Sequence, residues 1–170
     1  MTKWILVAAV VIAVAAFVLI QRSGTKTVYV NGLPEYNTLP GKEYIFERDC
    51  YIFKLDNEKT SYPLVGANAP DLPSSVSQLP NEVTDANVGK ELPGVRILDT
   101  VHVGDRFKIV SVRRDEKRDS TRVTFEILFI NESERRYPRL DAYYILDHSP
   151  EAKGAAPRMI DGYAVERVKK

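Results

Sequence analysis

The residues from Ile5 to Ile20, ILVAAVVIAVAAFVLI, carry no polar side chain, and no other feature constrains the chain as strongly. With Trp4 the run spans roughly 26 Å as a helix, against a bilayer core of about 30 Å. A soluble helix is disfavoured, because this one would be apolar on every face. The run therefore predicts an uncleaved transmembrane signal anchor. A cleaved signal peptide is the alternative, but the small residues Ala13-Val14-Ala15 are followed by more apolar residues.

This run divides the chain into a short N-terminal tail (1–3), an anchor in the lipid bilayer (4–20), a juxtamembrane linker (21–26) and a β domain (27–170). Positive charges flank the anchor equally, so the positive-inside rule does not orient it. By analogy with other short N-terminal anchors, we expect a single-pass protein of the bacterial inner membrane whose β domain is periplasmic.

The composition of the β domain excludes some functions. All 23 Asp and Glu residues but only 21 of the 24 Lys and Arg residues lie beyond residue 26, so its formal charge is −2. A nucleic-acid-binding domain would normally be basic, and no nucleic-acid partner is expected. Cys50 is the only cysteine, so the chain forms no internal disulfide.

Strand patterns dominate residues 27–170. Residues 42–56 predict a strand whose two faces are both mixed, which indicates a bulge near Arg48-Asp49 or burial on different faces at its two ends. Residues 105–113 and 121–130 predict a long antiparallel hairpin with a charged tip at 115–120. In the second strand every other residue is apolar (Val123, Phe125, Ile127 and Phe129), so one face of the strand is apolar throughout.

The remaining segments complete an expected small antiparallel barrel or sandwich of six or seven short strands. Residues 60–94 hold five of the ten prolines and lack periodicity, which predicts an extended loop or linker. Further strands are expected at 137–147 and 163–168.

The stretch RILDTVHVGDRFKIV (96–110) resembles bacterial Src-homology-3-like domains. The family's apolar and glycine positions would be filled by Ile97, Val101, Val103, Gly104, Phe107 and Ile109. The likeness covers 15 of 170 residues, and the Arg-Ser-Gly-Pro-type stretch that opens the family's domains is missing upstream. The resemblance implies a module that binds cell-wall glycopeptide or a protein partner.

Catalytic motifs are absent from the sequence. His102 and His148 have no metal-ligand spacing around them, and no phosphate-binding or nucleophile motif occurs. Cys50 is expected as a small core residue rather than a nucleophile. No enzyme activity, cofactor or metal is therefore predicted.

Two features suggest a contact surface. The cluster RRDEKRD (113–119) is charged with mixed sign, which also fits a solvated turn with internal ion pairs. Two adjacent tyrosines in a strand would point to opposite faces, so one would be exposed. The candidate contact residues are Arg113, Arg114, Lys117, Arg118, Tyr143 and Tyr144.

These observations predict a non-enzymatic, membrane-anchored envelope protein that binds a protein partner or a cell-wall component, as an accessory subunit of an envelope complex. The alternative is a membrane-tethered immunity or inhibitor protein. A concave acidic patch would favour the inhibitor, and an aromatic groove would favour recognition of a peptide or of the cell wall.

Overall fold

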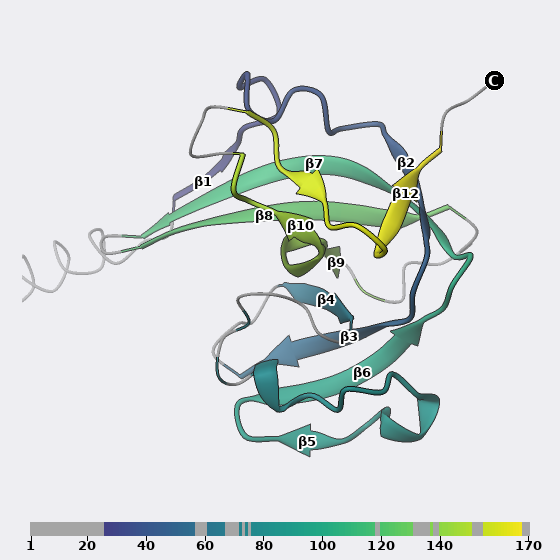
Figure 1. Cartoon of the computed structure of the whole chain (residues 1–170). Coiled ribbons are helices and arrows are strands. Elements are labelled where there is room, and N and C mark those ends of the chain that lie inside the picture. Colours follow the sequence, from purple (N-terminus) through teal and green to yellow (C-terminus); the bar gives the residue numbers. More distant parts are fainter. Residues whose placement is uncertain are drawn as a thin grey trace, which may run out of the picture.

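The structure is a computed structural model that describes residues 26–56, 61–66, 72, 74, 76–117, 120–130, 137, 140–150 and 155–167. Within these ranges the chain is mostly β (Figure 1). The strands are β1 (Lys26–Tyr29), β2 (Glu43–Phe46), β3 (Cys50–Leu55), β4 (Tyr62–Gly66), β5 (Glu91–Leu92), β6 (Val95–Val101), β7 (Arg106–Lys117), β8 (Ser120–Phe129), β9 (Leu140–Asp141), β10 (Leu146–Asp147), β11 (Arg158–Met159) and β12 (Ala164–Glu166). Three short 3-10 helices join them: η1 (Val76–Gln78), η2 (Asp85–Asn87) and η3 (Tyr143–Ile145).

One curled sheet holds ten of these strands. Its path runs β12-β2-β7-β8-β9-β4-β3-β6-β5, and β1 joins it beside β7. All neighbours pair antiparallel except β4 and β9, which are parallel. In Figure 1 the β7–β8 hairpin forms the upper part of the curl, and β3, β6 and β5 form the lower part. Strands β10 and β11 pair separately.

The sequence predictions about the anchor and the strand number are corrected by this architecture. No helix in the described ranges is long and apolar enough to cross a membrane, which contradicts the expected transmembrane helix followed by a β domain. Residues 4–20, where that helix was expected, lie outside the described residues. The β part has twelve strands in the described ranges, not six or seven, and most form one curled sheet rather than a closed barrel or a sandwich.

The predicted long hairpin is confirmed as β7 and β8. Their register runs from Phe107 opposite Phe129 to Lys117 opposite Ser120. The alternating apolar face packs on the core, with Phe125 and Ile127 buried. The strands continue farther than expected, so most of the charged stretch predicted as a turn lies within β7 and β8.

Two apolar clusters lie on opposite faces of β3. Cys50 and Ile52 belong to the larger cluster, which fills the curl, whereas Tyr51, Phe53 and Leu55 belong to a smaller one. Burial on both sides explains why residues 50–53 are apolar on both faces, and the polar residues that make each face of 42–56 mixed lie mainly at 47–49. The predicted single strand is in fact two strands, β2 and β3, separated by residues 47–49.

The proline-rich segment 60–94, expected as a loop or linker, contributes structure to both clusters. Strand β4 lies inside the sheet between β3 and β9. Val76 of η1 is fully buried in the smaller cluster. The Tyr51 hydroxyl donates a hydrogen bond to the Glu82 carbonyl (2.6 Å) and accepts one from the Asn87 amide. This segment therefore covers the second face of β3.

Replacing Tyr51 by phenylalanine should lower the free energy of unfolding by about 1–3 kcal/mol, because the substitution leaves buried polar groups without a partner. The Thr84 amide, 3.3 Å from the hydroxyl, would also lose its acceptor. Urea denaturation measures the effect. Tyr29→Phe is the matched control, because Tyr29 is 65% exposed and should change stability by less than about 0.5 kcal/mol. Equal effects of the two substitutions would contradict this role of the hydroxyl.

The C-terminal segment differs from its prediction in one place. Residues 137–147 were expected as one strand, but the described part forms β9, η3 and β10. The Asp141 carboxylate accepts a hydrogen bond from the Tyr143 amide (3.0 Å), a local turn that competes with an extended chain. The last expected strand, 163–168, is confirmed over Ala164–Glu166 as β12, and residue 168 lies outside the described residues.

Candidate functional site

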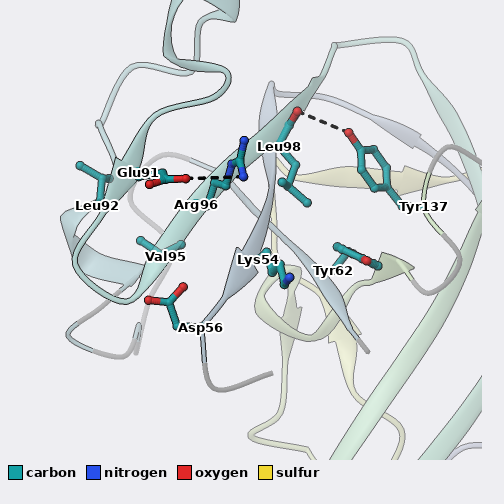
Figure 2. Close-up of a pocket in the computed structure, with 9 residues that line it drawn as sticks. All are labelled: Lys54, Asp56, Tyr62, Glu91, Leu92, Val95, Arg96, Leu98 and Tyr137. Atoms are coloured by element: carbon teal, nitrogen blue, oxygen red, sulfur yellow. Dashed lines mark hydrogen bonds and ion pairs between the residues drawn. The ribbon is translucent and has the colours of Figure 1, made fainter. Parts of the chain in front are cut away.

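A groove of about 560 Å³ lies beside β3, β6 and β5. Three of its lining residues, Tyr62, Leu98 and Tyr137, also pack against the larger cluster. Figure 2 shows its lining, which comes mainly from β3, β4, β5 and β6, with two further residues, one directly after β3 and one before β9. We call it the mouth groove. Its lining residues are Lys54, Asp56, Tyr62, Glu91, Leu92, Val95, Arg96, Leu98 and Tyr137.

Strand register places a row of charges in the mouth groove. Arg96 on β6 lies directly opposite Lys54 on β3 and, on its other side, opposite Glu91 on β5. Directly opposite residues in antiparallel strands point to the same face. The next residue, Ile97, points the other way, into the smaller cluster. The alternation of β6 thus presents Arg96 to solvent.

Two tyrosines form the aromatic wall of the mouth groove. The rings of Tyr62 and Tyr137 lie 5.5 Å apart at an interplanar angle of 48°. The Tyr137 hydroxyl donates a hydrogen bond to the Leu98 carbonyl (3.4 Å), drawn as a dashed line in Figure 2. Both rings are half-buried. They offer apolar surface beside the charged row.

The charges of the mouth groove only partly compensate one another. The Arg96 guanidinium lies 3.5 Å from the Glu91 carboxylate, with both side chains more than half exposed, so this pair contributes about 0–1 kcal/mol. Within the part of the chain that the structure describes, Lys54 and Asp56 form no ion pair. Lys54 faces Arg96, and like charges placed directly opposite each other are unfavourable.

A second groove, of about 730 Å³, contains the two tyrosines that the sequence singled out. Tyr143 and Tyr144 lie on η3, not on a strand, and both are half-buried. The Tyr143 ring stacks on the His148 ring with centroids 4.2 Å apart. Burial raises the pKa of Tyr144. This groove also contains Arg158, whose side chain is exposed.

The four predicted contact residues whose side chains the structure describes do not form one surface. The Arg113 side chain is 3% exposed and contacts Glu126, whereas Tyr143 packs beside Phe125. Phe125 and Glu126 are consecutive in β8, so their side chains lie on opposite faces of the sheet. Arg114 is partly exposed, 3.9 Å from Glu35. The side chain of Lys117 and the whole of Arg118 lie outside the described residues.

Cys50 is a core residue, as the sequence predicted. Its side chain has no exposed surface. Burial raises the pKa of the thiol to about 12, an effect that Arg48 opposes and Asp49 reinforces. Cys50 is therefore protonated near neutral pH.

The two histidines lie apart from each other in the fold. His102, in the turn at Gly104, has one ring nitrogen 3.8 Å from Asp49 and the other 3.6 Å from Asp85. His148 lies against Tyr143 in the second groove. Among the residues that the structure describes, no group of three or more His, Cys, Asp or Glu side chains could hold a metal ion.

No family model matches the chain, and the comparisons with curated proteins and with solved structures find no match either. The resemblance of residues 96–110 to Src-homology-3-like domains therefore stays a prediction. The turn within that stretch is present, with Gly104 at a φ of 93°, a conformation in which glycine is favoured.

Proposed function

We propose that the chain acts by binding, and that the mouth groove holds a segment of a partner protein without catalysing a reaction. The supporting observation is the combination of a tyrosine wall, Tyr62 and Tyr137, with a row of charges in one open groove. Tyrosine gives large, rigid and half-polar contact area. Grooves of this volume hold a few side chains or one small ligand.

Peptide recognition is favoured over the inhibitor alternative by the charge of this groove. An inhibitor with a concave acidic patch would carry an excess of carboxylates, but the mouth groove holds two cations and two anions. An aromatic groove of balanced charge suits an extended segment that has both apolar and charged side chains. The envelope location and the accessory role expected from the sequence stay predictions, on which this binding does not depend.

Site-directed photocrosslinking tests the proposed function. With p-benzoylphenylalanine in place of Tyr137 or Tyr62, irradiation of the producing cells should give a discrete crosslinked product that excess unlabelled wild-type protein suppresses. Tyr29 is the matched control site, because it is an exposed tyrosine on β1 that lines neither groove. No product from the groove positions, or the same product from position 29, would contradict the proposal.

A further inference from the structure

We infer that the mouth groove recognises an acidic side chain of the partner segment, with its carboxylate between Lys54 and Arg96 and a neighbouring apolar side chain against Tyr62 and Tyr137. This inference rests on the proposed function, since it names the chemistry of the segment that the groove would bind.

The first argument is the placement of two cations side by side. Lys54 and Arg96 are direct partners in the β3–β6 register, so their side chains leave the sheet on the same face. Both side chains are exposed, and the repulsion between their charges destabilises the free protein. A carboxylate between them would receive charge-assisted hydrogen bonds from an ammonium and a guanidinium, which converts the repulsion into two attractions.

The second argument is that the groove's own carboxylates leave this position open. Glu91 approaches Arg96 from the β5 side, opposite to Lys54, as the dashed line in Figure 2 shows. In the same view Asp56 lies below Val95, and Lys54 lies between it and Tyr62. Neither carboxylate forms an ion pair with Lys54 among the contacts of the described residues. By strand order, Lys54 on β3 lies between Arg96 on β6 and Tyr62 on β4.

The third argument selects a carboxylate over a phosphate. A phosphorylated side chain carries about −1.5 to −2 charge at neutral pH, and it would meet Asp56 and Glu91 in the same groove. A carboxylate carries one negative charge. With Asp56 and Glu91 the groove would then hold three negative charges against two positive ones, fewer than with a phosphate. An Asp or Glu next to an aromatic or aliphatic residue therefore fits the groove best.

The experiment is selection of displayed random peptides on the full-length wild-type protein, followed by titration calorimetry with the selected peptide. We expect enrichment of Asp or Glu beside an apolar residue. Lys54→Gln and Arg96→Gln should each weaken binding at least tenfold, and replacing the acidic residue of the peptide by its amide should remove that dependence on Lys54. Lys26→Gln is the matched control, because Lys26 is an exposed lysine on β1 outside both grooves.

Other outcomes separate this inference from the proposed function. Selected peptides that depend on Tyr137 (tested by Tyr137→Ala) but lack an acidic residue and ignore Lys54→Gln would overturn the inference and leave the groove as a binding site. Peptides that bind without depending on any groove residue would overturn both, as would a selection that yields none. Lys54→Gln should not lower the thermal midpoint of the free protein, because it removes a repulsion, so weaker binding is not explained by unfolding.

Discussion

Replacing Asp141 by alanine is expected to lower the free energy of unfolding by about 3–5 kcal/mol, the usual effect of removing one partner from a buried charged network. The Asp141 carboxylate has no exposed surface. One oxygen accepts hydrogen bonds from the Phe125 and Tyr143 amides, both at 3.0 Å. The other accepts from the Ser61 hydroxyl (3.2 Å) and the Arg122 guanidinium (3.3 Å).

These four donors come from separate parts of the sheet. Phe125 and Arg122 lie on β8, Tyr143 begins η3, and Ser61 precedes β4. Alanine would leave buried amides without an acceptor and would release η3 from β8. Urea denaturation measures the loss. Asp147→Ala is the matched control: Asp147 is an exposed aspartate whose carboxylate binds only Ser149 among the described residues, and its loss should be much smaller.

The contribution of Asp141 to the free energy of unfolding should also depend on pH. Burial raises the pKa of Asp141 against the opposing effects of Arg122 and of the two backbone amides. A carboxyl whose pKa is higher in the folded than in the unfolded state stabilises most below its unfolded pKa, and that contribution is lost as the pH rises through the folded pKa. Asp141→Asn does not titrate. The stability of the wild type relative to Asp141→Asn should therefore fall as the pH rises from about 3 towards 7, and a rise would contradict the raised pKa.

The sequence predicted those parts of the fold in which local alternation decides the structure. The β7–β8 hairpin follows from period-two alternation over adjacent residues and from a short connection. The segment 42–56 was harder, because β3 is covered on both faces and its second cover comes from residues beyond 70. The residues of β3 do not indicate which other segment packs against its second face. Strand β4 was missed for a different reason, because its five residues lie in a proline-rich context.

The candidate site depended even more on non-local pairing. Lys54 and Arg96 are 42 positions apart, and only the register of β3 with β6 makes them neighbours. Tyr137 reaches Tyr62 from another part of the chain. The Tyr143-Tyr144 pair was found by composition, but its strand assignment was wrong because Asp141 turns the chain two residues earlier. A motif search cannot find such a site, because its residue types are common and their spacing carries no signal.

Arg113→Ala is expected to lower the free energy of unfolding by about 3 kcal/mol or more, whereas Arg114→Ala should change it by less than about 1 kcal/mol. The two arginines are adjacent in β7 and point to opposite faces. The Arg113 guanidinium lies 3.2 Å from both Asp115 and Glu126, with its side chain 3% exposed. Arg114 is 29% exposed, and a carboxylate oxygen of Glu35 lies 3.9 Å from its guanidinium.

The size of the difference follows from what each truncation leaves behind. Without Arg113, the partly buried carboxylates of Asp115 and Glu126 would both lose their cation, and the space that the guanidinium filled would have to be hydrated. Without Arg114, Glu35 is simply hydrated. Urea denaturation of the two variants compares them directly. If both variants were as stable as the wild type, Arg113 would not be a buried structural cation, and the contact surface first expected at residues 113–118 would again be the better interpretation of this charged stretch.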